Sequence, residues 1–391
     1  MTALTRTMKS AFDIFQKWIR NQKLDPVLAA AWGLAVISAI FVHPDKEYLS
    51  YIDWRSLGIL WGLMVVIQGF RENTVFEKIG ETVLHRVKYG WQLAAVLILM
   101  CFLGSMVITN DVALITFVPF AIMIMKNCKR EDLMIPVVVL QTIAANLGSM
   151  LTPIGNPQNL YLYGVTGMSV GSFVLTMLPL ALLTILLLGF GIALLPEKRR
   201  QIELDDNYGI VKGFGSKTQI ILYGILFMLA IFSVLRVIPY YVVVILIFIT
   251  VLIMSYRVLL HVDYTLLLTF IGFFIFTGNI GRIPQINETL AHLVKGREFL
   301  LGVLTSQVIS NVPATLLLTG FAGDYKELLQ GVNVGGLGTL IASMASLISY
   351  KSYTNIYPEH KGKYILKFTV YNLVFLLFLC AFHIILRKMI G

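Results

Sequence analysis

Apolar stretches of about 17 to 25 residues recur along this chain, separated by short polar or glycine- and proline-containing segments. Such a stretch crosses the hydrocarbon core of a membrane as an α-helix, whereas a transmembrane β-strand needs only about ten alternating residues. Of the 391 residues, 57% are hydrophobic and 13% are charged, which is more apolar side chain than a water-soluble protein of this length can bury. The sequence therefore predicts an all-α polytopic membrane protein. The predicted spans are 27–43, 55–70, 92–125, 133–165, 171–195, 218–237, 239–256, 264–279, 299–322, 328–350 and 364–386.

The net charge of +10 does not indicate a nucleic-acid partner, because the basic residues lie in loops, as membrane anchors do. Residues 1–26 are basic and amphipathic, which predicts a surface helix at the membrane. We expect no signal peptide, since no small-residue cleavage site follows the first apolar run.

An internal repeat divides the chain into two halves. With Ser105 set on Ser306, SMVITNDVALITFVPF aligns with SQVISNVPATLLLTGF. A second block aligns NLGSMLTPI (146–154) with NVGGLGTLI (333–341), and a weaker one aligns IDWRSLGILWG with VDYTLLLTFIG. Three matches in the same order on both sides of one polar linker indicate that the chain is a duplicated half.

Counting Lys and Arg orients the spans. We treat 92–125 and 299–322 as hairpins that enter and leave on one side. Most basic residues then fall on the side of the N-terminus, which is predicted to be cytoplasmic, and the C-terminus is predicted to lie outside. The two repeats therefore have inverted topology. Each arm of 92–125 has about 16 residues, or ~24 Å, short of the ~30 Å core as expected for a re-entrant hairpin.

The predicted organisation comprises about nine full spans and two hairpins. A cytoplasmic N-terminal segment is followed by a first repeat with a hairpin and a broken helix, a cytoplasmic linker, and a second repeat of the same kind. The boundaries are 1–26 for the segment, 27–195 for the first repeat (hairpin 92–125, broken helix 133–165), 196–217 for the linker, and 218–391 for the second repeat (hairpin 299–322, broken helix 328–350).

Polar residues interrupt the predicted helices at equivalent places in both halves. Thr109-Asn110-Asp111 corresponds to Ser310-Asn311, and TPIGNPQN (152–159) corresponds to TLIASMAS (339–346). Unwound backbone at membrane depth is tolerated only where it faces protein or a water-filled cavity. Hairpin tips and broken helices that meet near the midplane are the usual construction of a secondary-transporter site. Taken singly, each of these residues could equally serve only to hold helices together.

The same segments have suitable chemistry for ions. Asn156 before Pro157 is predicted to be a helix N-cap, and Asn311 two residues before Pro313 is interpreted similarly. Helix N-termini facing a cavity favour an anion. The carbonyl, hydroxyl and amide oxygens of the loops suit a small hard cation such as Na⁺.

Asp111 breaks the symmetry, because its repeat partner is Val312. An acidic residue at membrane depth is by default a functional candidate. Three interpretations remain open: a proton-binding site, an added charge in a cation site, or a carboxylate that only satisfies the first turn of the second hairpin arm.

The segments ITNDVALITFVPF, ANLGSMLTPIGNPQN, SQVISNVPATLLL and NVGGLGTLIASMAS resemble the signature segments of the ion transporter superfamily. That group contains divalent anion/sodium symporters, citrate transporters, arsenite efflux permeases and some sodium/proton antiporters. The resemblance covers nearly the whole chain after residue 27. It implies two inverted repeats, each with a re-entrant hairpin and a broken helix, in a homodimer with an elevator-type transport domain.

The resemblance also implies site residues by matching position. The cation sites would use Ser105, Thr109, Asn110 and the Gly155 backbone in the first half, with Asp111 beside them, and Ser306, Ser310, Asn311 and the Ala342 backbone in the second. The substrate would contact Thr109, Asn110, Asn156, Pro157, Ser310 and Asn311.

Two departures affect what the resemblance implies about substrate. Asp111 and Val312 stand where the sodium-coupled carboxylate members have threonine. A carboxylate at this place is closer to the arsenite permeases and antiporters, whereas TPIGNPQN is closer to the anion permeases.

The sequence thus predicts a secondary active transporter of a small anion, a carboxylate or an inorganic oxyanion, coupled to Na⁺ or H⁺ by alternating access. The alternatives are a sodium/proton antiporter or arsenite efflux permease that uses Asp111, and an ion channel. We expect no enzyme activity, catalytic residue or cofactor, and no metal beyond Na⁺, because the spans contain no metal, nucleophile or phosphate-loop motif. The expected partners are the anion, the lipid bilayer of the cell membrane and a second copy of the chain.

Overall fold

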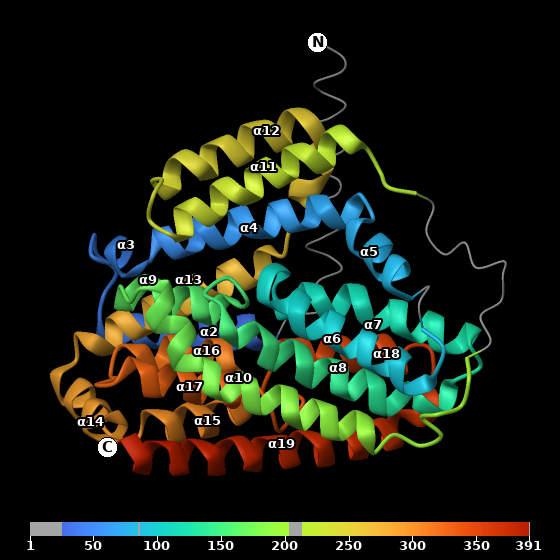
Figure 1. Ribbon diagram of the computed structural model, residues 1–391. Helices are drawn as coiled ribbons and strands as arrows, with labels where there is room; N and C mark the ends of the chain where they lie inside the picture. The colour runs from blue at the N-terminus through green and yellow to red at the C-terminus, as the bar shows by residue number, and fades with distance from the viewer. Residues whose placement is uncertain (1–25, 85–86, 203–212, 391) are drawn as a thin grey trace. The chain divides into compact units, whose positions relative to one another are not determined.

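The computed structural model describes residues 26–84, 87–202 and 213–390 (Figure 1). Within these residues the chain forms helices, and the extended pairing is limited to a single bridge between Tyr89 and Gln201. Eight of the described helices are long and apolar enough to cross a membrane. The prediction of an all-α polytopic membrane protein is therefore confirmed. The predicted surface helix in 1–26 lies almost wholly outside the described residues.

The chain divides into two compact units. The first contains α2 (Pro26–Phe41), α3 (Tyr48–Tyr51) and α13 (Tyr264–Gly281). Gly272 lets α2 and α13 approach closely, since a Cβ there would lie 3.1 Å from the Ala31 backbone. The buried Asn279 amide donates to Ser38 Oγ at 3.0 Å and to Tyr48 Oη at 2.9 Å. Small residues and interhelical hydrogen bonds are the means by which helices associate in lipid.

The second unit contains all the remaining elements. In chain order they are α4 (Trp54–Glu72), α5 (Val75–Leu84), α6 (Gly90–Ile108), α7 (Asn110–Asn127), η1 (Glu131–Leu133), α8 (Met134–Gly148), η2 (Ser149–Leu151), α9 (Pro157–Thr166), α10 (Val170–Ala193), α11 (Lys217–Val234), α12 (Tyr240–Leu260), α14 (Pro284–Val294), α15 (Glu298–Ile309), α16 (Asn311–Thr319), α17 (Tyr325–Val334), α18 (Met344–Thr354), η3 (Pro358–His360) and α19 (Lys361–Ile390).

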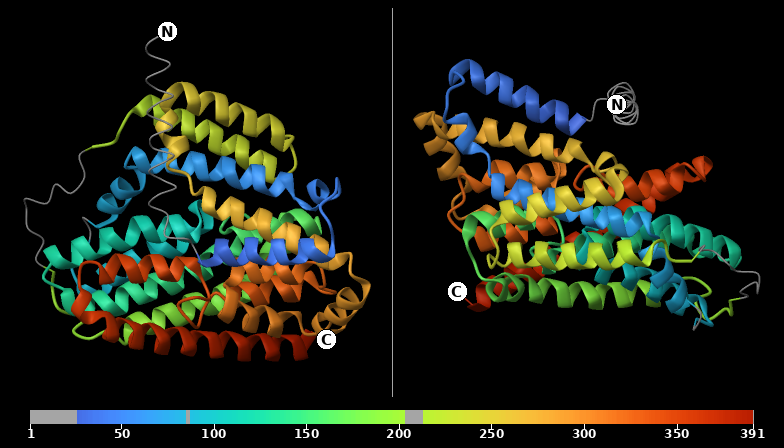
Figure 2. Two further views of the ribbon diagram at one scale, coloured as in Figure 1. Left: turned by 180° about the vertical axis from the view of Figure 1, so that it is seen from behind. Right: turned by 90° about the horizontal axis from the view of Figure 1, so that it is seen from above.

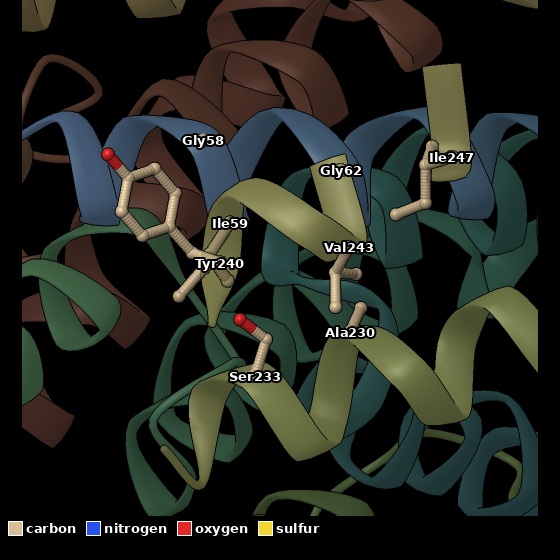
Figure 3. A pocket seen from close by; sticks show the side chains of 8 residues that line it. All are labelled: Gly58, Ile59, Gly62, Ala230, Ser233, Tyr240, Val243 and Ile247. Carbon is tan, nitrogen blue, oxygen red and sulfur yellow. The ribbon is translucent and has the colours of Figure 1, made fainter. Parts of the chain in front are cut away.

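Within this unit α4, α11 and α12 lie side by side (Figure 1). Gly58 and Gly62, one turn apart on α4, admit side chains of α12: a Cβ at Gly58 would lie 3.1 Å from the Tyr240 ring, and one at Gly62 would lie 3.0 Å from Ile247. Figure 3 shows the cleft left by this packing, which is too narrow for a water molecule. The three helices are therefore joined by close packing of small residues against large ones.

Both predicted hairpins are present, but the first is longer than predicted. Helix α6 has 19 residues and α7 has 18, or about 28 and 27 Å at 1.5 Å per residue, instead of about 16 each. Helices α15 and α16 have 12 and 9 residues. The added residues lie at the outer ends of the two arms and include the exposed Trp91 and Lys126. Arm length alone therefore does not mark the first hairpin as re-entrant.

Both broken helices are present as well. Helix α8 ends at Gly148 and the chain resumes as α9, whereas α17 ends at Val334 and the chain resumes as α18. We call residues 149–156 break 1 and residues 335–343 break 2. Helix α19 is continuous and packs along α8 and α10 (Figure 2).

Candidate functional site

Each hairpin reverses at a single residue with the same unusual backbone. Thr109, between α6 and α7, has φ 72° and ψ 154°, and Ser310, between α15 and α16, has φ 76° and ψ 154°. This region of φ/ψ space is almost reserved for glycine, and other residues there cost about 1–3 kcal/mol. Strain held at two equivalent hydroxyl-bearing residues points to a functional role for these tips.

Each tip is bonded to the break of its own half. The backbone N–H of Asn110 donates to the Gly155 carbonyl at 3.1 Å, and that of Asn311 donates to the Ala342 carbonyl at 2.9 Å. The two backbone oxygens proposed as cation ligands therefore lie at the two tips. The Gly155 carbonyl oxygen has a second lone pair available for a ligand, whereas the Ala342 oxygen also accepts from Ser310 Oγ at 3.5 Å.

The same correspondence holds one turn before each tip. A Cβ on Gly148 would lie 2.7 Å from Ser105 Oγ, and one on Gly335 would lie 2.8 Å from Ser306 Oγ. Both serines are fully buried, and each donates to a carbonyl of its own helix. The structure thus places Ser105 and Ser306 against the broken helices, where glycine is needed for close approach.

Amide and hydroxyl side chains join the two halves at the centre. Asn156 Nδ2 donates to Asn333 Oδ1 at 3.0 Å, and Ser343 Oγ donates to Asn146 Oδ1 at 2.9 Å. In the repeat alignment Asn156 corresponds to Ser343, and Asn333 corresponds to Asn146. The two bonds therefore join equivalent pairs of residues, with the first and second halves of the chain exchanged.

A second pair of bonds repeats this exchange. Asn333 Nδ2 donates to Asn159 Oδ1 at 2.7 Å, and Asn146 Nδ2 donates to Ser346 Oγ at 3.3 Å. Contacts that recur with the halves exchanged are those that an approximate two-fold rotation produces and a simple translation does not. We call these six residues the central network: Asn146, Asn156, Asn159, Asn333, Ser343 and Ser346.

Asn110 connects the first tip to this network. Its Nδ2 donates to Asn146 Oδ1 at 3.1 Å, and the side chain is 4% exposed. Its Oδ1 is buried and has no hydrogen-bond partner among the described residues. An unsatisfied buried acceptor costs about 1–3 kcal/mol, so a cation or a hydrogen-bond donor would be bound favourably here. Carbonyl, hydroxyl and amide oxygens such as those of this tip are of the kind that can hold a small hard cation such as Na⁺.

The second tip differs in detail. Asn311 Oδ1 accepts from the Val312 N–H at 3.0 Å and lies 3.5 Å from Ser310 Oγ. Ser310 is the N-cap of α16, so the interpretation of Asn311 as a cap is wrong. The chain reverses at Ser310, and Asn311 therefore already belongs to the first turn. The prediction for Asn156 is confirmed: it caps α9 by accepting from the Asn159 N–H at 2.9 Å, with Pro157 at the first helical position.

Asp111 lies in the first turn of α7 and is half-buried, whereas its counterpart Val312 is buried. The carboxylate is therefore present on one tip only. Four helices begin in this region (α7, α9, α16 and α18), and each N-terminus carries a partial positive charge. The region thus combines positive helix ends with neutral oxygens and one carboxylate.

The structure brings most of the predicted residues together. Thr109, Asn110, Gly155 and Asn156 gather at the first tip and break, Ser310, Asn311 and Ala342 gather at the second, and Pro157 follows directly in α9. The predicted site does not include the other five residues of the central network, Asn146, Asn159, Asn333, Ser343 and Ser346. The signal for two of these was present, because Asn146 and Asn333 are identical at matched positions of the repeat.

Comparisons with known proteins identify the family of this chain. Residues 14–345 match the sequence profile of the citrate transporter family, CitMHS. The chain is 32% identical over 327 residues to the inner membrane protein YbiR of Escherichia coli, covering 78% of this chain and 82% of that protein. It is 33% identical over 321 residues to the uncharacterized transporter MJ0456 of Methanocaldococcus jannaschii, covering 82% and 86%.

A shorter match also concerns a transporter. The silicon efflux transporter LSI3 of Oryza sativa is 31% identical over 163 residues, covering 41% of this chain and 32% of that protein. The family profile covers most of the chain and includes both tips and both breaks up to residue 345. The chain belongs to the citrate transporter family and is a multi-pass membrane transporter.

Proposed function

We propose that this transporter moves a small anion, a carboxylate or an inorganic oxyanion, by secondary active transport coupled to Na⁺ or H⁺. The observation that carries the proposal is the convergence of two strained tips and two breaks on one central network. Four helix N-termini favour the anion, and the carbonyl, amide and hydroxyl oxygens favour the coupling cation.

The bonding pattern supports an elevator-type mechanism. Each tip is bonded to the break of its own half, and each break is bonded to the helix that precedes the other break. The site is therefore held within one body, and opening it by separating tip from break would sacrifice these bonds. Moving the whole body across the membrane exposes the site to either side without breaking them.

An alternative has support from one residue. The carboxylate of Asp111, present on the first tip only, could carry a proton in exchange for a cation. This would make the protein a sodium/proton antiporter or an arsenite efflux permease; the silicon efflux transporter LSI3 of Oryza sativa is a relative with efflux in its name. Asp111 distinguishes these functions from symport of an anion.

The test is ligand-dependent thermal stability of the purified protein in detergent, with a panel of carboxylates and oxyanions, with and without Na⁺, at pH 6 and 8. A ligand at 100 times its Kd adds about 2.7 kcal/mol to stability. We expect one class of anion to stabilise the protein only when Na⁺ or a proton is also bound. Stabilisation by Na⁺ alone, stronger at high pH and unaffected by any anion, would support the antiporter.

Two variants locate the site. Asn110→Ala and Asn311→Ala should each abolish ion-dependent uptake into proteoliposomes, while the protein remains monodisperse. Asn355→Ala, the same change at an exposed position after α18, is the matched control and should transport normally. Normal uptake by both tip variants would refute the site assignment, and a steady conductance without uphill accumulation would indicate a channel.

A further inference from the structure

A groove of about 510 Å³ runs between α6 and α10, away from the central network. Its walls are apolar and mostly small: Trp91 and Ala95 come from α6, and Gly189, Ile192 and Ala193 come from α10. At one end it is lined by Lys198 and Arg199, which follow α10. The groove therefore combines an apolar trough with two cations at its end.

The segment that carries these cations is held firmly against the mouth of the first hairpin. The N–H of Trp91 donates to the Lys198 carbonyl at 2.8 Å, and the N–H of Gly90 donates to the Arg200 carbonyl at 3.1 Å. On the far side the Ile202 N–H donates to the Lys88 carbonyl at 2.9 Å. The backbone on both sides of Arg199 is thus fixed by the hairpin.

A buried arginine reinforces this attachment. Arg130 is 1% exposed, and its guanidinium donates to the Glu197 carbonyl at 3.2 Å and to the Arg200 carbonyl at 3.5 Å. Its charge is balanced by two hydrogen bonds to the Asp132 carboxylate, at 3.0 and 2.9 Å. The basic segment is consequently preorganised, and less conformational entropy is lost when it binds an anion.

Charge is also distributed unevenly along the segment. The Glu197 carboxylate lies 3.4 Å from the Arg200 guanidinium, at exposed positions, whereas Lys198 and Arg199 line the groove. Lys198 folds back so that its ammonium donates to the Ala193 carbonyl at the C-terminal end of α10. Both cations are therefore directed to the end of the apolar trough.

We propose that this groove binds an anionic phospholipid, with an acyl chain along Ala95, Gly189 and Ala193 and the phosphate at Lys198 and Arg199. Basic pockets between transmembrane helices bind anionic headgroups in this way, with about 1 kcal/mol, or about fivefold in affinity, for each basic side chain. The exposed Trp91 ring, 42% accessible, lies where an aromatic residue meets the headgroup region. The lipid would contact both the first arm of the hairpin and the segment after α10 that is hydrogen-bonded to it.

The direct measurement uses Trp91 as a reporter. In a protein whose other four tryptophans (Trp18, Trp32, Trp54 and Trp61) are changed to Phe, brominated-chain phosphatidylglycerol should quench Trp91 at a concentration roughly 25-fold lower than brominated phosphatidylcholine does. Native mass spectrometry of the unaltered protein, counting retained phosphatidylglycerol, gives the same preference independently. Equal quenching and equal retention of the two lipids would overturn the proposal.

Two variants separate charge from shape. Lys198→Gln/Arg199→Gln should abolish the preference, whereas Lys126→Gln/Lys361→Gln removes the same charge from exposed positions outside the groove and should retain it. Gly189→Leu should fill the trough without a clash, since no atom lies within 4 Å of a Cβ there. It should reduce lipid binding with the charges intact.

A soluble headgroup distinguishes a lipid from a free phosphate. Glycerol phosphate at millimolar concentration should not compete with the lipid, because it cannot fill the trough. Full competition by glycerol phosphate would show that the site takes only a free anion and would refute the proposal. Unchanged lipid affinity in the Gly189→Leu protein would show that no acyl chain occupies the trough and would refute it as well.

Discussion

Replacing Asn333 by alanine tests whether the central network holds the two breaks together. The side chain is 1% exposed and makes three hydrogen bonds. Its Nδ2 donates to Asn159 Oδ1 at 2.7 Å and to the Leu329 carbonyl at 2.8 Å, and its Oδ1 accepts from Asn156 at 3.0 Å. Alanine removes all three without introducing a clash.

The expected loss follows from these bonds. Each is worth about 1 kcal/mol net, and the loss of a donor to the fully buried Asn159 Oδ1 adds about 1 kcal/mol. The free energy of unfolding should therefore fall by roughly 3–5 kcal/mol, at the upper end of single-residue effects. With an unfolding entropy of about 2.1 cal/mol/K per residue, this corresponds to a decrease in Tm on the order of 5 °C.

The assay is thermal unfolding in detergent at one fixed heating rate, because a membrane protein of this size unfolds irreversibly and its Tm depends on scan rate. Asn146→Ala is the repeat-equivalent variant. Asn146 also takes part in three side-chain bonds, to Ser346, Ser343 and Asn110, and its variant should lose a similar amount. Asn355→Ala, at an exposed site, should shift the Tm by less than about 1 °C.

The reasoning is refuted if Asn333→Ala shifts the Tm no more than Asn355→Ala does. It is also refuted if Asn146→Ala is neutral while Asn333→Ala is destabilising, since the bond of Asn156 to Asn333 and the bond of Ser343 to Asn146 are related by exchange of the halves. Size-exclusion profiles recorded in parallel distinguish lower stability from failure to fold.

Three further predictions concern single positions. Asp111→Asn should remove or shift the pH dependence of transport, and an unchanged pH profile would mean that the carboxylate only caps α7. Gly155→Ala should abolish transport, because its Cβ would lie 2.0 Å from the Ser149 carbonyl oxygen, whereas Gly224→Ala, in open space, should be tolerated. In the first unit, a hydrogen bond from Arg282 holds the pKa of Asp45 below its ordinary 3.8. The pair therefore stabilises the folded state above pH 3.8 and ceases to do so as pH falls through the folded pKa, so Arg282→Gln should be slightly less stable at pH 7, with the difference disappearing in acid.

The positions of both tips and both breaks could be predicted because a duplicated sequence carries the same local signals twice. A residue such as Asn110 within an apolar run is ambiguous alone. Asn110 matches Asn311 in the repeat, and Gly148 matches Gly335. These matches indicate that the hairpin tips and the breaks are not parts of uninterrupted transmembrane helices. The structure shows why these residues recur. Each glycine leaves room for a serine of the hairpin, and each asparagine N–H donates a hydrogen bond to a carbonyl of a break.

The central network could not be predicted, since its bonds cross between halves about 180 residues apart. Repeat identity marks Asn146 and Asn333 as equivalent but does not indicate which residue each reaches. Arm length was underestimated for a different reason. Hydropathy detects where a helix leaves the apolar core, whereas the helix itself ends at its last hydrogen bond, which for α7 lies beyond Lys126.

The differences between the two halves bear most directly on where the coupling ion and the anion bind. Duplication explains the features that both halves have, but not those that only one half has. Asn156 makes side-chain bonds to Ser149, Asn333 and the Asn159 N–H, whereas Ser343 makes one, to Asn146, among the described residues. Asn156 is therefore fixed by more side-chain bonds than Ser343, and its break contacts the tip that carries Asp111. A rigid set of oxygens beside a carboxylate suits a small cation, whereas an anion is repelled by that carboxylate. We therefore expect the coupling cation to bind at the first tip and the anion to bind closer to the second, where Val312 takes the place of the charge.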